Sequence, residues 1–434
     1  MTGKIIVLFS LVFFFRAGGD TAGAEVLTLP AGLKIAAENS RLLKMAERDE
    51  SISDAEALIE KSRLLPSVNA SLSGTALAYQ PGALFGNQTV PLSEREFLAY
   101  SISIQQTLYD FRANASRYEA GRMRAGTKRL ETRRIRNLVA IGFALAYFDL
   151  LEAEKIVAVA GREVERVEAH LRDARNLYEE GVITKNDLLQ AEVRLSDARQ
   201  RLLSAGNQRA INVSRLNNIM VRPLNTGLDP VDPDGTAFPL TAVSREGEGE
   251  AVFLRPEVQI VDETLKALGL EELSKKAENY PRIFARGSYD YTENRFQTHE
   301  GNWAMTIGLG VNLFSGGSTK AEIEKLGHLK MRLMEQRSKL LEDIRLEAET
   351  YLLSAGSAGE RVSVTKDAVR QADENLRINR LRYEEGVGTA TEVLDAVALM
   401  TVAETNYFRA VYDLRKAETA YLYSIGKDLL EVYK

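Results

Sequence analysis

The sequence predicts a mainly α-helical fold that also supplies strands to a transmembrane β-barrel. Three observations predict it. One stretch of sequence occurs twice at a fixed offset, two pairs of segments alternate apolar and polar residues, and two very long segments lack proline and carry apolar residues at heptad spacing. A fixed offset indicates two copies of one structural unit within the chain.

The repeat is clearest where residues 383–387 (YEEGV) match residues 178–182 at an offset of 205 (383 − 178). A glycine after a glutamate-rich turn can take the left-handed conformation that ends a helix. The Thr and Asn residues that follow can cap a new helix. We therefore expect the apex of a helical hairpin near Gly181 and another near Gly386.

The chain has 434 residues, formal net charge −5, 45% hydrophobic residues and no cysteine. The absence of cysteine excludes disulfides, thiolate metal sites and a lipid anchor on cysteine. The mild negative charge argues against nucleic acid as a partner. The three histidines are scattered and are expected at the surface, and no nucleophile–base or metal-binding set is apparent, so we expect neither an enzyme nor a cofactor.

Residues 1–24 have the features of a cleaved secretory signal. Lys4 precedes an apolar run over residues 5–15, and Ala22-Gly23-Ala24 provides small residues for cleavage. An N-terminal membrane anchor is the alternative, but the apolar run is shorter than the roughly 20 residues that a spanning helix needs.

The first unit is predicted to cover residues 25–222. It begins with a helix over 27–63 that Pro66 ends. A strand over 68–76, a loop over 80–97 and a strand over 98–108 follow, with Leu108 on the apolar face. One helix over 112–180, or two helices stacked end to end with a joint near Gly161, leads to the first apex and to a return helix over 187–220.

The helices are expected to form coiled coils. In the return helix, leucines recur at 188, 195 and 202, and alanines at 191, 198 and 205. Apolar residues seven apart make a left-handed coiled coil. The helix predicted over 112–180 would be about 100 Å long.

The second unit is predicted to cover residues 251–426, after an equatorial connector over 223–250. It repeats the order of the first: a helix from Arg255 to about residue 279, strands over 283–291 and 303–313 around a loop at 292–302, a helix over 319–385, and a return helix over 391–423. Gly356 and Gly359 suggest a joint in the long helix. Gly308, Gly310, Gly316 and Gly317 are interpreted as strand residues at a close approach. Residues 427–434 form a tail.

The four strands predict a membrane barrel shared between chains. Strands of about 12 residues that alternate apolar and polar side chains suit a transmembrane barrel, and the aromatic residues near their ends suit membrane interfaces. A sheet packed on helices is the alternative. Four strands cannot close a barrel, and an open edge in lipid leaves polar groups unpaired. Three copies would supply 12 strands.

The chain resembles the TolC-like outer-membrane efflux proteins over nearly its whole length. The features that carry the resemblance are the signal sequence, the doubled unit, the Arg255-Pro256-Glu257 motif, the strand ends at 106–109 (QTLY) and 311–314 (VNLF), and above all the two apex motifs. The resemblance implies a homotrimeric channel-tunnel with a 12-stranded barrel and a tapered helical barrel in the periplasm.

The resemblance also implies roles for the apex residues. Gly181, Val182, Gly386 and Val387 would contact a periplasmic adaptor that links the channel to an inner-membrane pump. A simpler interpretation is that Gly181 and Gly386 serve to end helices.

At the aperture, Tyr383 would match a lock tyrosine, Asp187 its acidic partner, and Glu392 and Asp395 two pore carboxylates. The alternative for the three acidic residues is stabilisation of the helix dipole in a first turn. Gly388 stands where the resemblance implies a lock arginine.

The function that these expectations favour is a passive outer-membrane duct of an efflux or type I secretion system. Its partners would be two further copies of the chain, an adaptor, a pump and outer-membrane lipid. A periplasmic coiled-coil adaptor or scaffold is the alternative, and it would need a lipoyl-like β-sandwich. Drugs, metal ions and polypeptides all remain open as cargo.

Overall fold

A computed structural model describes residues 25–233, 253 and 255–433. The predicted signal sequence and the part of the predicted connector after residue 233 lie outside the described residues. The elements of the first unit are β1 (Glu25–Leu27), α1 (Leu29–Asn39), α2 (Arg41–Ser62), β2 (Ser67–Ala76), β3 (Gly82–Phe85), β4 (Gln88–Pro91), β5 (Glu96–Tyr109), α3 (Ala113–Glu179) and α4 (Lys185–Ile219). Those that follow are β6 (Leu228–Pro230), α6 (Pro256–Ala277), β7 (Arg282–Thr292), β8 (Gly301–Gly310), α7 (Ser318–Glu384), α8 (Ala390–Ser424) and α9 (Leu429–Val432).

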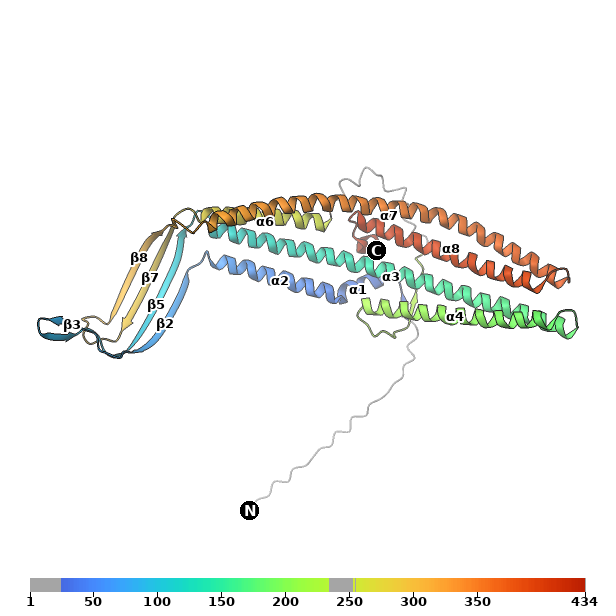
Figure 1. Cartoon of the computed structure of the whole chain (residues 1–434), viewed down its shortest axis with the longest axis horizontal. Coiled ribbons are helices and arrows are strands. Elements are labelled where there is room, and N and C mark those ends of the chain that lie inside the picture. Colours follow the sequence, from blue (N-terminus) through green and yellow to red (C-terminus); the bar gives the residue numbers. More distant parts are fainter. Residues whose placement is uncertain (1–24, 234–252, 254, 434) are drawn as a thin grey trace, which may run out of the picture.

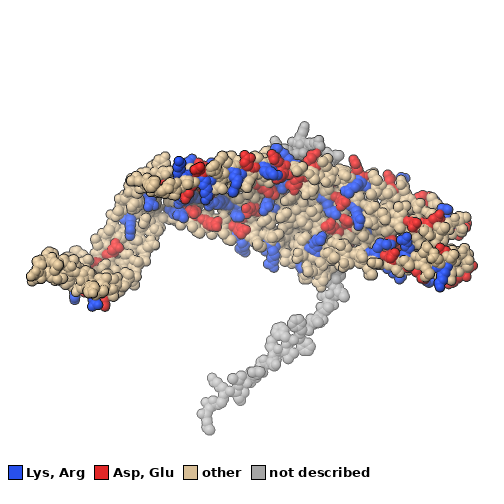
Figure 2. Space-filling model, in the orientation of Figure 1, with Lys and Arg blue, Asp and Glu red and all other residues tan. Residues whose placement is uncertain are grey.

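The molecule is elongated, with a sheet at one end and two helical hairpins at the other (Figure 1). The hairpin α3–α4 belongs to the first unit and the hairpin α7–α8 to the second. Figure 2 shows that charged side chains are spread over the helical part and are sparse over the sheet. The predicted order of elements, with a strand pair before each long helix, is confirmed.

The main sheet has the order β2-β5-β7-β8 and is antiparallel throughout. The register places Ala70 opposite Ile102, Ile102 opposite Tyr289, and Tyr289 opposite Trp303, so apolar side chains share one face. Ser101 lies opposite Ser71 and Asp290 on the other face. The predicted alternation is confirmed, and the sheet has one apolar and one polar face.

A β-bulge at the end of β5 changes the alternation that was predicted there. The pairing steps from Thr107 opposite Phe284 to Tyr109 opposite Ile283. Leu108, predicted to continue the apolar face, is therefore the extra residue of the bulge, and Tyr109 stands in line with Ile283 and Leu309.

The predicted loop over 80–97 contains a hairpin, so the prediction of an irregular loop is wrong there. Strands β3 and β4 pair around Gly86, which has a φ of +62°. A two-residue Gly-Asn turn between short strands favours such a hairpin.

Both long helices run without interruption. Helices α3 and α7 contain 67 residues each, about 100 Å at 1.5 Å per residue. The joints suggested at Gly161 and at Gly356 and Gly359 are absent, because an interior glycine weakens a helix by only about 1 kcal/mol and the packing of neighbouring helices compensates.

The helix predicted over 27–63 is broken at Ser40. This residue has a ψ of 123°, and its side-chain oxygen accepts a hydrogen bond from the Leu43 N–H (3.3 Å), so it ends α1 and caps α2. Before α1, β1 pairs in parallel with β6. These short elements wrap the middle of the molecule, where the Tyr147 hydroxyl donates to the carbonyls of Leu27 (2.8 Å) and Val231 (2.6 Å).

The largest apolar core lies at this middle level. It combines residues of α1, α3, α8 and α9 with the C-terminal end of α4, and its fully buried aromatic side chains are Phe143, Tyr147, Phe148, Tyr412 and Tyr421. Both hairpins are therefore anchored in one core at their bases and extend from it.

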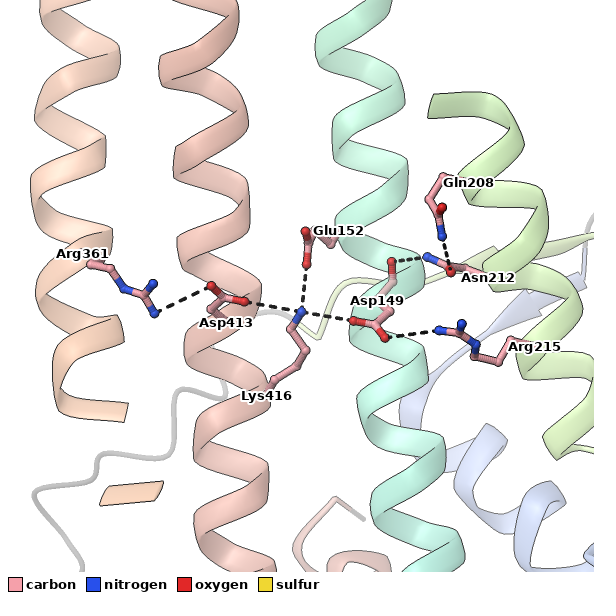
Figure 3. A network of polar contacts seen from close by, with 8 residues as sticks. All are labelled: Asp149, Glu152, Gln208, Asn212, Arg215, Arg361, Asp413 and Lys416. Carbon is pink, nitrogen blue, oxygen red and sulfur yellow. Dashed lines mark hydrogen bonds and ion pairs between the residues drawn. The ribbon is translucent and has the colours of Figure 1, made fainter. Parts of the chain in front are cut away.

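A polar network beside this core joins all four hairpin helices (Figure 3). Lys416 of α8 donates to Asp149 (3.1 Å) and Glu152 (2.9 Å) of α3. Asp149 also lies 3.9 Å from Arg215 of α4, and Asp413 lies 3.7 Å from Arg361 of α7. The network fixes the two hairpins to each other at their bases.

Within the described part of the chain, none of the helices combines the length and the apolar character that crossing a membrane requires.

Candidate functional site at the hairpin tips

Each hairpin tip closes with the same helix-ending motif. In the first, Gly181 has a φ of +77°, its N–H bonds the Tyr178 carbonyl (3.0 Å), and the Val182 N–H bonds the Leu177 carbonyl (2.8 Å). This is a Schellman motif, and the left-handed residue in it favours glycine.

The second tip repeats the motif. Gly386 has a φ of +73°, its N–H bonds the Tyr383 carbonyl (3.1 Å), and the Val387 N–H bonds the Arg382 carbonyl (2.9 Å). The helix-terminating role of both glycines is therefore confirmed. It leaves Val182 and Val387 62% and 70% exposed at the ends of the molecule.

Capping boxes begin the return helices. Thr184 accepts from the Asp187 N–H (3.3 Å), and the Asp187 carboxylate accepts from the Thr184 N–H (3.1 Å) and hydroxyl (2.8 Å). In the second tip, Thr389 accepts from the Glu392 N–H (3.3 Å), and the Glu392 carboxylate accepts from the Thr389 N–H (3.0 Å). Both carboxylates therefore stabilise a helix start, which is the alternative role anticipated for them.

Asp395 lies one turn further along α8 and has no such role. Its side chain is 66% exposed, and Arg194 of α4 lies 3.8 Å away. Among the acidic residues predicted at the aperture, Asp395 is thus the one whose carboxylate is open to solvent and not held in a capping box.

Tyr383 lies between the hairpins and not on an open surface. It is 5% exposed, and it packs with Leu177 of α3 and with Ala390 and Val393 of α8. Burial, reinforced by the negative charges of Asp187 and Asp173, raises the pKa of the Tyr383 hydroxyl, which is therefore neutral.

His170 of α3 faces Tyr383, and sequence reasoning missed it. The expectation of a surface histidine is wrong here, since His170 is 3% exposed and its ring centroid lies 5.0 Å from that of Tyr383. Neither His170 Nε2 nor the Tyr383 hydroxyl has a hydrogen-bond partner among the described residues. A signal was present in the sequence, because His170 stands seven residues before Leu177 on the buried stripe of the coiled coil.

A side chain at Gly388 would crowd the backbone at the end of α7. The Gly388 N–H donates to the Arg382 carbonyl (2.8 Å), and a Cβ built on it would lie 3.0 Å from Tyr383 N and 3.1 Å from Arg382 C. A residue with a Cβ at this position would therefore require a shift of a few tenths of an ångström.

The polar contacts between the hairpins become weaker toward the tips. Near the base is the Lys416 network, and midway Glu404 of α8 accepts from Arg162 (3.2 Å) and Arg166 (2.9 Å) of α3. At the tip, the Arg194–Asp395 pair at 3.8 Å and a Gln190–Thr391 contact at 3.4 Å are both exposed. Exposed pairs contribute little, so the buried contacts of Tyr383 are the main link between the hairpins near the tips.

A sheet with one apolar face, joined to long helical hairpins, is the arrangement expected of an outer-membrane channel with a helical extension. The family model of the outer membrane efflux proteins matches residues 32–220 and 273–426. The chain belongs to this family, which places it with the outer-membrane channel components of export systems. This assignment favours the channel over the alternative of an adaptor.

Relatives and solved structures agree with this assignment. The outer membrane efflux protein BepC of Brucella suis is 23% identical over 419 residues, which cover 94% of this chain and 87% of BepC. The alkaline protease secretion protein AprF of Pseudomonas aeruginosa is 22% identical over 408 residues, covering 90% and 82%. The crystal structure of the outer membrane protein VceC from Vibrio cholerae has the same fold, with a TM-score of 0.79, 16% identity and coverage of 92% and 96%.

Proposed function

We propose that three copies of the chain form a passive export duct through the outer membrane. One observation carries the proposal: the main sheet has an apolar and a polar face, and its outer strands β2 and β8 each lack a second partner among the described strands. An unpaired edge in lipid is unfavourable, and four strands are too few to close. Three sheets joined edge to edge give 12 strands with the polar faces around a lumen.

The helices would continue this duct into the periplasm. Two hairpins from each copy, with α3 and α7 about 100 Å long, supply the wall of a helical barrel. In this arrangement the leader at residues 1–24 directs export and is removed, and the absence of cysteine leaves no thiol for a lipid anchor.

The tips would dock a periplasmic adaptor that connects the duct to an inner-membrane pump. Support comes from the two matching apices, which place Gly181 with Val182 and Gly386 with Val387 at the far end of the molecule, each with an exposed apolar side chain. BepC is by name an efflux protein and AprF a secretion protein. The cargo would accordingly be small molecules or polypeptides that the pump delivers.

At the aperture we assign different roles to the predicted residues. Asp395 would form a ring of three carboxylates, which favours cations. Tyr383 would hold the hairpins together as part of a lock, while Asp187 and Glu392 keep the helix starts in place.

Planar-bilayer recording of protein purified from the outer-membrane fraction tests the duct and the Asp395 ring together. The wild-type protein should conduct and prefer cations. Asp395→Asn should conduct with a reduced cation preference, because three charges leave the lumen. Glu342→Gln, an exposed substitution on α7 away from the tip, is the matched control. The absence of any pore contradicts the duct, and unchanged selectivity in Asp395→Asn contradicts the ring.

A further inference from the structure

The two units make the same turn where a strand of the main sheet passes into a long helix. In the first, the Ala113 N–H bonds the Asp110 carbonyl (3.0 Å) and the Ser116 N–H bonds the Arg112 carbonyl (2.8 Å). In the second, at the offset of 205, the Ser318 N–H bonds the Ser315 carbonyl (3.2 Å) and the Ala321 N–H bonds the Gly317 carbonyl (3.1 Å). Each unit is therefore an internal control for the other.

The turn requires two successive left-handed residues. The prediction of Gly316 and Gly317 as strand residues is wrong, because β8 ends at Gly310 and these two glycines have left-handed φ of +63° and +82°. The equivalent residues Phe111 and Arg112 have φ of +51° and +67°. Glycine adopts this region freely, whereas residues with a Cβ are disfavoured in it. The first unit thus has Phe111 and Arg112 at the positions where the second unit has Gly316 and Gly317, and glycine is the residue that this backbone conformation favours.

Packing within the chain does not account for the left-handed conformation of Phe111 and Arg112. The Phe111 ring stacks on Tyr280 and meets Tyr109 edge-on, both at 4.9 Å between centroids, yet Phe111 is 42% exposed and the other two rings more than half. The Arg112 side chain is 72% exposed, and among the described residues its ion-pair partner is the exposed Glu119 (3.0 Å). Strained residues that persist without being buried point to a partner outside the chain.

The position of this aromatic group indicates the partner. Tyr109 continues the apolar face of the sheet beside Ile283, at the end where the sheet meets the helices (Figure 1). At the opposite end of that face, Tyr100 stacks on Tyr291, with centroids 4.7 Å apart.

The two aromatic groups lie nine residues apart on β5 (109 − 100). Because Leu108 is the extra residue of the bulge, this separation equals eight paired positions (291 − 283 on β7). Eight residues span roughly 26 Å along a strand, and a tilt of about 40° reduces this to roughly 20 Å, near the apolar height of roughly 25 Å of a membrane barrel. The two groups are therefore spaced as two aromatic belts.

We infer that the Phe111–Arg112 turn is a phospholipid contact site at the periplasmic face of the outer membrane. The Phe111 ring lies at the boundary between head groups and acyl chains, and the Arg112 guanidinium donates to a lipid phosphate, which it matches in charge and in planar geometry. The second unit, with Gly316 and Gly317, lacks both groups. The inference rests on the proposed insertion of the sheet in the membrane.

Tryptophan fluorescence tests the inference, because Trp303 is the only tryptophan of the chain. Wild-type protein and Phe111→Trp with Trp303→Phe are reconstituted in vesicles of phosphatidylethanolamine and phosphatidylglycerol brominated near the head groups. Bromine should quench both tryptophans, and aqueous iodide should quench neither. Tyr280→Trp with Trp303→Phe probes the same site with an ordinary backbone if the first variant does not fold.

The outcomes separate the two claims. If Trp303 is quenched by bromine but the new tryptophans are quenched only by iodide, the lipid contact is wrong and the insertion stands. If bromine quenches none of them, both are wrong.

The role of Arg112 is tested by the affinity of the purified protein for phosphatidylglycerol, measured by native mass spectrometry. Arg112→Gln should lower it about tenfold, as expected for loss of one hydrogen bond to a charged group. Arg124→Gln is the matched control, an exposed arginine of α3 about 18 Å further along the helix. Equal affinities in the two variants would overturn the assignment of Arg112.

Discussion

At the second tip, Gly388 lies where a larger residue would crowd the backbone of α7. A Cβ there would lie 3.0 Å from Tyr383 N, and backbone atoms cannot move away as a flexible side chain can. We expect Gly388→Ala to destabilise the tip by about 1–3 kcal/mol, as overpacking does. Hydrogen exchange at residues 383–393 measures this.

Gly359→Ala is the control for that substitution, since nothing lies within 4 Å of a Cβ built on Gly359 inside α7. It should leave exchange unchanged or slow it, because alanine is the better helix former. Equal protection at the tip in both variants would show that the space around Gly388 is not limiting.

The contact between His170 and Tyr383 should make tip separation depend on pH. Burial lowers the pKa of His170, Arg380 acts in the same direction, and Asp173 opposes both. His170 therefore binds a proton less tightly when the tips are packed together than when they are separated. The contact is at full strength above the ordinary histidine pKa of 6.5 and weakens as the pH falls below it.

Spin labels on cysteines introduced at Gln190 and Thr391 can measure this separation, as the chain has no cysteine of its own. Lowering the pH from about 7.5 to about 5.5, which spans the titration of histidine, should shift the distance distribution to longer values. His170→Gln should abolish the shift. A shift that persists in His170→Gln would assign the pH dependence to another group.

At this scale the sequence predicted the conformations of the tips but not their contacts. The motif around Gly386 was sufficient to predict a helix end, because the left-handed turn depends on local residues alone. The burial of His170 depends on the register between α3 and α7, which are far apart in the sequence. The sequence also could not decide between the two roles considered for Glu392, because a helix cap and a pore carboxylate call for the same residue type at that position.

At the scale of elements, Lys416 ties the base of one hairpin to the other. Its side chain is 24% exposed and that of Glu152 is 18% exposed, so the pair is largely withdrawn from water. Lys416→Ala leaves Glu152 without its cation and leaves Asp149 with the more distant Arg215 alone (3.9 Å). We expect a loss of about 2 kcal/mol in the free energy of unfolding, below the 3–5 kcal/mol of a fully buried pair because solvent screens this one in part.

Chemical denaturation of the purified protein measures that loss. Lys339→Ala removes an exposed pair with Asp343 on α7 alone, so a change below about 0.5 kcal/mol is expected for it. If the two variants lose the same stability, the network in Figure 3 does not hold the hairpins together.

The periodic spacing of apolar residues and the absence of proline predicted the long helices well, and the alternation of apolar and polar residues predicted the four main strands. Each of these patterns extends over many residues. The departures were short-range. Ser40 breaks a helix through its backbone and its capping side chain, and the bulge at Leu108 shifts a register that alternation alone cannot show. The β3–β4 hairpin was missed because its strands have only four residues each.

At the scale of the whole molecule, the sheet is the incomplete part. Apolar side chains remain exposed on the apolar face of the sheet and also on helices, such as Leu58 of α2 and Leu346 of α7. Only the sheet, however, also has edges, β2 and β8, that are unpaired among the described strands. Neighbouring copies of the same sheet would satisfy both edges at once, and a closed ring would have no edge left.

The most direct test of this account is a disulfide scan between the two edge strands in the outer membrane. Each variant carries one cysteine on β2 and one on β8 of the otherwise cysteine-free chain, and non-reducing electrophoresis follows oxidation. Where the two cysteines meet across subunits, the account predicts a covalently closed ring that migrates as a trimer. Monomers at every position, or an open ladder beyond the trimer, would contradict it.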